Sequence, residues 1–550
     1  MNLLLHLENE LTNYILSAFK IDKSFLRNDL FALNVDEQKQ GFGDLSSNIA
    51  LLLAKPLGQQ PRSIAQKIQH EFSHPFVSKI EIAGPGFLNI WLTPQAYVTL
   101  AETLFEQQEQ FFKLEKNTQK HTFNVEFVSA NPTGPLHLGH GRGGIIGDVL
   151  GNVLRFLGHS VTKEFYINDA GSQIQKLGAS FKARCLEQLG FEFQLPEDGY
   201  QGEYLKELAA KCIAQYGSAL PEKSDEFFAQ YAKTELLEAI KKTLIDYGIH
   251  FDTWFSEKTL HDSGAITQSL KRLEERDQTY VQDHALWFRS TTYGDDKDRV
   301  VRKANGELTY AAADIAYLEN KISRGFDKIV IVLGQDHHSY KQRLAGFLQA
   351  LGYKADMLDV ILYQLVTLKE SGELVRMSKR AGKIVTLRDI IDTVGKDVAR
   401  FFYLNRKADA HLDFDIDLAL KKTEENPVYY VQYAYVRTGS IIQKGHTQEG
   451  LAQIGPHDAV NLGQEEQLLL KKIVSLKNLL EAISSSNQTH SLTYYVLELA
   501  QLFHSYYAKN RVIDAEKIDQ SRARLLLIII LRNTFKTCLD LLGVSSPDKM

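Results

Sequence analysis

One stretch, residues 124–151, constrains the fold of this chain more than any other. Residues 125–128 are a short apolar run rich in β-formers, which predicts a buried strand. Residues 131–135 hold two prolines and a glycine, so they form a turn. From His137 onward the apolar spacing becomes helical, as shown by Ile145, Ile146, Val149 and Leu150. The stretch therefore predicts a strand, a tight turn and a helix that begins with His137-Leu138-Gly139-His140.

The start of this helix suits a nucleotide triphosphate. The first turn of a helix leaves backbone N–H groups unpaired and carries the positive end of the helix dipole, so it attracts phosphate. His137 and His140 lie three residues apart on one face and could both donate hydrogen bonds to a phosphate. Gly139 and Gly141 would let a flat base approach the backbone. The alternative is an ordinary glycine-rich turn with two surface histidines.

A second motif lies far downstream, at residues 375–383, with the sequence VRMSKRAGK. It forms a basic loop between an apolar run at 360–368 and an apolar-periodic segment at 384–391. With Lys379 at its centre, such a loop could close on a pyrophosphate leaving group. A solvated basic loop is the alternative.

The strand–turn–helix is followed by a second strand at 159–167 and a turn at 168–171. A strand, helix and strand at this spacing predict a right-handed crossover and a parallel sheet. Ligands then belong at the carboxyl ends of the strands. The chain has no G-x-G-x-x-G sequence, which argues against a dinucleotide cofactor. Residues 180–300 are charged, with few strand signals, and predict a helical insertion.

Downstream of the insertion, Tyr310 and Asp314 are four residues apart and share a face if the segment is helical. An aromatic ring beside a carboxylate suits a guanidinium group, which takes charge-assisted hydrogen bonds and stacking. The alternative is a surface helix with a partly exposed tyrosine. The strand predicted at 328–333 ends in Gly334-Gln335-Asp336-His337, where a ligand site is expected.

The two ends of the chain have different patterns. Residues 1–35 look helical, Asp44 or Ser46 could cap the next helix, and 79–83 and 87–92 alternate like strands, which predicts a small α/β domain. From Asn426 the pattern is almost wholly helical, with loops at 445–463 and 484–491. Aromatic residues in this bundle, such as those at 504–507, could stack on unpaired RNA bases.

Composition excludes several classes of protein. A chain of 550 residues holds several domains. No apolar segment is long enough to span a bilayer, and the acidic N-terminus is not that of a signal peptide. The three cysteines are far apart and predict neither disulfides nor a metal site, so we expect a cytoplasmic protein. The net charge of −5 leaves room for a local basic face, with seven Lys or Arg against three acids between Lys509 and Lys536.

The two motifs resemble the HIGH and KMSKS motifs of class I aminoacyl-tRNA synthetases, and nearly the whole chain resembles the arginyl-tRNA synthetases. Arg376 and Arg380 depart from KMSKS, which leaves their role open because a guanidinium is a planar fork and not a compact ammonium. The resemblance implies a Rossmann-type α/β catalytic domain with a helical insertion, a small α/β domain before it and an all-α bundle after it. The corresponding boundaries are 1–110 (tRNA-contacting), 116–395 (catalytic), 396–425 (connecting) and 426–550 (anticodon-binding).

The resemblance also implies the reaction: arginine is activated with ATP to arginyl-adenylate and then joined to its tRNA. ATP would come with Mg²⁺, and the partners would be L-arginine and the tRNA for arginine. We expect the protein to be a monomer and not to associate with a membrane. The implied ATP-site residues are His137, Gly139, His140, Met377, Ser378 and Lys379, with His137, His140 and Lys379 catalytic. The implied arginine-site residues are Glu126, Ser129, Asn131, His140, Tyr310, Asp314 and Gln335.

Two other functions fit parts of the pattern. One is a different class I synthetase or a small nucleotidyltransferase, against which the Tyr310 and Asp314 pair and the accessory domains argue. The other is an inactive RNA-binding paralogue, against which His137, His140 and Lys379 argue.

Overall fold

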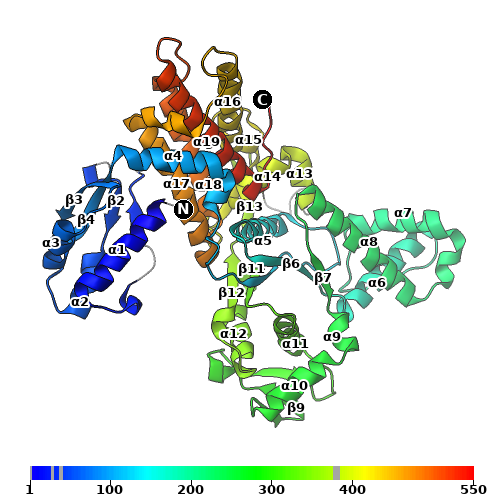
Figure 1. Cartoon of the computed structure of the whole chain (residues 1–550). Coiled ribbons are helices and arrows are strands. Elements are labelled where there is room, and N and C mark those ends of the chain that lie inside the picture. The colour runs from blue at the N-terminus through cyan, green and yellow to red at the C-terminus, as the bar shows by residue number, and fades with distance from the viewer. Residues whose placement is uncertain (1–2, 27–29, 36–40, 338, 376–384) are drawn as a thin grey trace.

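A five-stranded parallel sheet organises the central part of the chain (Figure 1). The computed structural model describes residues 3–26, 30–35, 41–337, 339–375 and 385–550. Neighbouring strands are parallel, in the spatial order β12-β11-β5-β6-β7. This confirms the parallel sheet predicted from the strand–helix–strand spacing. The strands are β5 (Thr122–Glu126), β6 (Ser160–Ile167), β7 (Thr253–Ser256), β11 (Lys328–Gly334) and β12 (Leu358–Tyr363).

Helix α5 (Leu138–Leu157) connects β5 to β6 and lies close against the sheet because glycines form its inner face. A Cβ atom on Gly147 would stand 2.2 Å from Cγ of Phe127, and one on Gly151 would stand 2.5 Å from Cε of Lys163. Only glycine permits such a close helix–sheet approach without displacing the neighbours.

The sheet separates two hydrophobic cores. Along β11, Val330 and Val332 pack into the core that includes α5, whereas Ile329 and Ile331 pack into a second core. The second core lies under α11 (Tyr310–Ser323) and α12 (Tyr340–Ala350). Strands covered on both faces read as continuous apolar runs, which is why β11 was recognisable from sequence.

The segment between β6 and β11 is only partly the predicted helical insertion. Helices α6 (Ser172–Leu189), α7 (Glu203–Tyr216) and α8 (Asp225–Asp246) form a module with its own small core. Beyond α8 the prediction is wrong: β7 is an edge strand of the main sheet, and a three-stranded antiparallel sheet follows. Four-residue strands are too short for a period-2 pattern to stand out. The later elements are α9 (Lys258–Asp262), α10 (Ala265–Glu275), β8 (Thr279–Gln282), β9 (Ala285–Phe288) and β10 (Arg299–Arg302).

The N-terminal part is the small α/β domain expected, with two corrections. Its first helix ends at Phe19, so the helix predicted over residues 1–35 is too long. Asp44 caps no helix; its carboxylate accepts from the backbone N–H of Leu92 and pairs with Lys471 of the C-terminal bundle. The elements are α1 (Leu3–Phe19), β1 (Ala32–Leu33), β2 (Leu45–Ser47), α2 (Ile49–Leu57), α3 (Pro61–Glu71), β3 (Val77–Ala83), β4 (Phe87–Leu92) and α4 (Pro94–Gln107).

The C-terminal part is the predicted helical bundle, reached through a short mixed segment (Figure 1). That segment holds β13 (Val366–Glu370), β14 (Glu373–Val375), α13 (Leu387–Val394), α14 (Lys396–Leu404), β15 (Leu412–Asp415) and α15 (Ile416–Leu420). The bundle holds α16 (Pro427–His446), α17 (Gln464–Ser486), α18 (His490–Lys509) and α19 (Ile518–Leu542). In the described part of the chain, no helix is both long and apolar enough to cross a membrane.

A buried charge cluster joins this bundle to the catalytic sheet. Asp148 of α5 accepts from Arg400 Nη2 at 2.5 Å and from Lys163 Nζ at 2.6 Å. Arg400 also donates to the backbone oxygens of Leu542, at the end of α19, and Tyr247, at the end of α8. Burial alone would raise the pKa of Asp148, but Arg400 and Lys163 hold that pKa below its ordinary value.

We predict that Arg400→Met lowers the melting temperature strongly, because it leaves a buried carboxylate with one of its two cations and removes a donor from the carbonyls of Tyr247, Gly248 and Leu542. Breaking such a buried pair costs about 3–5 kcal/mol. Lys536→Met is the matched control, since it breaks an exposed i,i+4 pair with Asp540 worth roughly 0.3–0.5 kcal/mol. Thermal unfolding followed by circular dichroism measures both; equal shifts would refute the role given to Arg400.

Candidate active site

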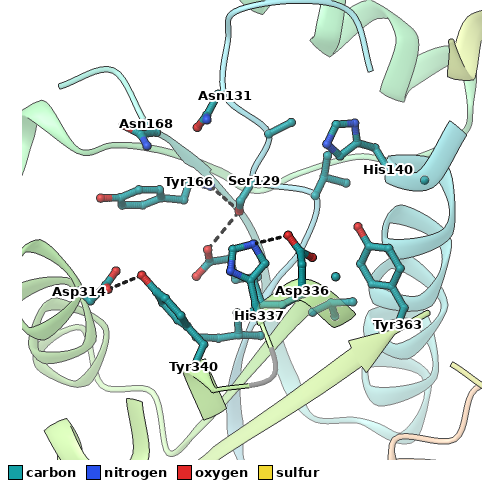
Figure 2. A pocket seen from close by; sticks show the side chains of 18 of the residues that line it. Ser129, Asn131, His140, Tyr166, Asn168, Asp314, Asp336, His337, Tyr340 and Tyr363 are labelled. Atoms are coloured by element: carbon teal, nitrogen blue, oxygen red, sulfur yellow. Dashed lines mark hydrogen bonds and ion pairs between the residues drawn. The ribbon is translucent and has the colours of Figure 1, made fainter. Parts of the chain in front are cut away.

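A cavity of about 670 Å³ opens at the carboxyl edge of the five-stranded sheet. Every strand contributes to it: Glu126, Gly334 and Tyr363 end β5, β11 and β12, Tyr166 is the last residue but one of β6, and Glu257 follows β7 directly. Figure 2 shows Asp314 and Tyr340 at one end and His140 with Tyr363 at the other, with Ser129 between them. The cavity lies where a ligand site is expected, at the carboxyl ends of parallel strands.

His137 and His140 stack on each other with ring centroids 3.7 Å apart. The backbone N–H of His137 donates to Nδ1 of His140, and the N–H of Gly139 donates to Nδ1 of His137, both at 3.1 Å. Because each Nδ1 accepts, the proton of each neutral ring sits on Nε2. Burial lowers both pKa values, that of His140 to about 3 with the charge of His137 adding to the effect. The two rings are therefore neutral Nε2–H donors at physiological pH.

The amides of the first turn of α5 are already paired, so the predicted unpaired N–H groups are wrong for this helix. Leu138 N–H donates to the oxygen of Val385, and His140 N–H donates to the oxygen of His137. Gly141 also differs from its prediction: a Cβ there would lie 2.7 Å from Cδ1 of Leu387, so its small size accommodates protein and not a base. Gly139 does line the cavity. Of the donors expected to meet a phosphate at this helix, the Nε2–H groups of the two imidazoles are the ones that remain.

The turn after β5 brings the hydroxyl of Ser129 within hydrogen-bond distance of the ends of β5 and β6. Val128 and Ser129 have φ angles of 65° and 40°, in a region that costs a non-glycine residue about 1–3 kcal/mol. Ser129 Oγ donates to Glu126 Oε1 at 3.1 Å and accepts from the N–H of Tyr166 at 3.1 Å. Asn131 lines the cavity beside them. The strained turn thus brings together three of the residues expected at the arginine site.

The opposite end of the cavity is acidic. Asp314 and Tyr310 both come from α11 and line the cavity, as expected from their spacing. Tyr340 donates to Asp314 Oδ2 at 2.8 Å. Burial, with Glu126 and Glu257 nearby, raises the pKa of Asp314 to about 7, against the hydrogen bond from Tyr340 and the charge of Arg343. Within the described ranges, no lysine or arginine forms an ion pair with Asp314.

Sequence reasoning missed two cavity residues, Glu257 and Tyr340. Burial raises the pKa of Glu257, which interacts with Tyr166 and His261. The signal for Glu257 was its place directly after a strand, but that strand lay in the segment predicted to be helical. Gln335 lines the cavity as expected. The KMSKS-like residues Arg376, Met377, Ser378, Lys379 and Arg380 lie outside the described residues.

Comparison with known proteins matches this architecture part by part. The family model for the catalytic domain of class I tRNA synthetases (R) covers residues 100–410, and the arginyl-tRNA synthetase N-terminal domain covers 6–92. The DALR anticodon binding domain covers 431–550. The fold and site are those of a class I aminoacyl-tRNA synthetase.

Similar proteins show which member of this class of synthetases the chain resembles. The arginine–tRNA ligase of Bacillus subtilis is 40% identical over 551 residues, covering 99% of this chain and 98% of its own. That of Anoxybacillus flavithermus is 43% identical over 514 residues, covering 92% of each chain. Arginyl-tRNA synthetase from Thermus thermophilus shares the fold, with a TM-score of 0.73 at 20% identity over 99% of both chains. The chain belongs to the arginyl-tRNA synthetase family and has arginine–tRNA ligase activity.

We predict that arginine binding weakens as the pH falls below about 7, the pKa of Asp314 in the empty cavity. A guanidinium binds the charged carboxylate, so protonation competes with arginine and the Kd rises toward tenfold per pH unit. Above about 7 the carboxylate is ionised and the Kd levels off. Titration calorimetry between pH 5.5 and 8.5 measures this, with Asp314→Asn as the variant that loses the dependence. A flat profile in the unaltered protein would contradict the assignment.

Proposed function

We propose that the cavity holds arginine with its guanidinium at Asp314 and its α-ammonium group at Glu126, Ser129 and Asn131. The α-carboxylate then points toward His140, where the ATP phosphates lie. The observation that carries this orientation is the placement of Asp314 and His140 at opposite ends of one cavity (Figure 2).

The acidic end suits a guanidinium better than an ammonium. One oxygen of Asp314 is fixed by Tyr340 at 2.8 Å, which aligns the carboxylate. A planar fork can donate two parallel hydrogen bonds to such a carboxylate, whereas an ammonium acts as a point charge. Tyr310, a residue that is 58% exposed and lines the same cavity as Asp314, offers an aromatic ring for stacking. Glu257, which also lines the cavity, adds negative potential near Asp314, and Gln335 supplies a polar group next to the end of β11.

Activation is an in-line attack of the arginine carboxylate on the α-phosphorus of ATP, which forms arginyl-adenylate and releases pyrophosphate. The Nε2–H groups of His137 and His140 stabilise the charge that develops on phosphate oxygens. Lys379 stays a predicted partner of the pyrophosphate, with Met377 and Ser378 beside it. Mg²⁺ enters as the ATP complex; among the residues described, no three His, Cys, Asp or Glu side chains gather to bind a metal. Transfer to the terminal ribose of the tRNA releases AMP.

The remaining parts serve the tRNA. We propose the division 1–110, 116–395, 396–425 and 426–550, in which the first part contacts the body of the tRNA. The bundle presents aromatic and cationic groups together: Arg437 lies over the rings of Tyr433 and Tyr507, at 4.5 and 5.2 Å. Such faces stack on unpaired bases. We propose that the enzyme works in the cytoplasm as a monomer, which light scattering after gel filtration tests directly.

We predict that Asp314→Asn raises the KM for arginine at least about hundredfold, because a site built for a charged group loses its partner. Tyr340→Phe should raise it about fivefold, since it removes one hydrogen bond of about 1 kcal/mol. The measurement is aminoacylation of tRNA at varied arginine and saturating ATP. The KM for ATP serves as the internal control. If Asp314→Asn kept an ordinary arginine KM, the guanidinium would bind elsewhere.

We also predict that His140→Ala slows arginine-dependent exchange of pyrophosphate into ATP by about 10²–10³-fold, the usual effect of losing one donor to a developing charge. The assay contains the tRNA for arginine, and arginine binding is followed separately by calorimetry. His457→Ala, an exposed histidine of the bundle, is the control. Normal exchange in His140→Ala would remove the imidazole from the mechanism, whereas absent exchange with normal tRNA binding in the unaltered protein would indicate an inactive RNA-binding protein.

A further inference from the structure

One buried lysine lies directly behind the cavity wall without lining it. Lys321 belongs to α11, the helix that also carries Asp314, and its side chain is fully buried. Its ammonium lies 2.9 Å from Glu126 Oε2 and 3.0 Å from Glu164 Oε1. It also donates to Asn124 Oδ1. The ammonium thus donates to Asn124 and Glu164 and forms an ion pair with Glu126.

The two carboxylates are not equivalent. Glu164 is not among the residues that line the cavity, and it is also held by Arg324, whose guanidinium donates to both carboxylate oxygens at 2.5 and 2.9 Å. Tyr317 donates to it as well. These partners hold the pKa of Glu164 at about 2 despite its burial. Glu126 lines the cavity, and Lys321 is the cation with which it forms an ion pair among the described residues.

We infer that Lys321 is a positioning residue for arginine binding: it pairs with one oxygen of Glu126 and so holds this carboxylate in place at the cavity wall. Oε2 lies against the ammonium of Lys321, and Oε1 accepts from Ser129, so each carboxylate oxygen has a partner that orients it. The inference rests on the proposed role of Glu126 as the partner of the α-ammonium group. Lys321 itself touches no substrate.

The charge balance around Glu126 explains why a cation is needed there. A buried carboxylate near like charges is destabilising unless an opposite charge compensates it. Lys321 is the cation that pairs with Glu126, whereas Arg324, which belongs to the same cluster, contacts Glu164. The titratable and charged groups around Glu126 are Lys321, Asp314, Tyr317 and Arg324 of α11 and its end, Glu164 and Tyr166 of β6, and Glu257 after β7.

The test compares arginine with 5-guanidinopentanoate, which is arginine without its α-amino group. Both ligands keep the guanidinium and the carboxylate, so they differ only in the α-ammonium group, whose proposed partners are Glu126, Ser129 and Asn131. In Lys321→Met, we expect the arginine Kd at pH 7.5 to rise at least about thirtyfold, as for loss of one partner of a buried charge pair. The Kd for 5-guanidinopentanoate should stay within about threefold. Calorimetry on the full-length protein measures both.

Arg324→Met is the matched control, because it removes a cation from the same buried cluster without touching Glu126. It should leave the ratio of the two Kd values unchanged. In Lys321→Arg, which keeps the charge, the ratio should recover. If Lys321→Met does not fold, Lys321→Gln serves in its place.

Each outcome separates this inference from the proposed function. Equal weakening of both ligands by Lys321→Met would show general damage and overturn the inference, as would an unchanged arginine Kd. In Glu126→Gln the arginine Kd should rise selectively, and adding Lys321→Met should weaken binding little further, because residues acting as a unit are not additive. If instead Asp314→Asn affected neither ligand, the proposed guanidinium site would fail while the Lys321 result still stood.

Discussion

The pairing of Asp148 with Lys163 and Arg400 is the contact on which the arrangement of the domains depends. Asp148 lies on α5, about three turns beyond the histidines at its N-terminus. Through Arg400, the same carboxylate is linked to the C-terminal carbonyls of α19 and of α8. Asn152 adds a bond to the oxygen of Leu541. One buried anion therefore ties α5 to the C-terminal bundle, so any shift of α19 acts on α5 through a direct contact.

The acids at the cavity and behind it fall into two groups: those whose charge is balanced by a cation of the protein, and one without such a cation among the described residues. Glu126 and Glu164 share Lys321 in a buried network. Asp314 has a hydrogen bond from Tyr340 but no ion pair in the described part of the chain, and burial raises its pKa. The first group has its cationic partner within the protein, whereas Asp314 has none among the described residues. In the proposed orientation, the guanidinium of arginine supplies the missing cation at Asp314, and the α-ammonium group binds at the group that Lys321 holds.

Long, regular features were predictable from sequence and short or tertiary ones were not. The strand–turn–helix at 124–151 and the α11 pair of Tyr310 and Asp314 follow from local periodicity, and the structure places both on the cavity. Glu257 was missed because β7 has only four residues, partly buried throughout, and lacks an alternating pattern. The first-turn amides were misjudged because their partners, such as the oxygen of Val385, are far away in sequence. In the sequence, Lys321 looks like an ordinary helical lysine. Its partners lie on β5 and β6, far away along the chain.

Burial acts on both ends of the cavity in the same direction, toward neutrality. It raises the pKa of Asp314 and lowers those of His137 and His140, so acid and base alike favour their uncharged forms. The two ends of the cavity then differ in whether a ligand must change the ionisation of the protein group. In the proposed orientation, a guanidinium cation favours the charged carboxylate, which makes binding at that end sensitive to pH. At the other end the tautomer is fixed by backbone N–H donors, so each ring presents Nε2–H without taking up a proton. The proposed phosphate contacts of the histidines are therefore available across the physiological pH range, whereas the proposed recognition of the arginine side chain depends on the ionisation of Asp314.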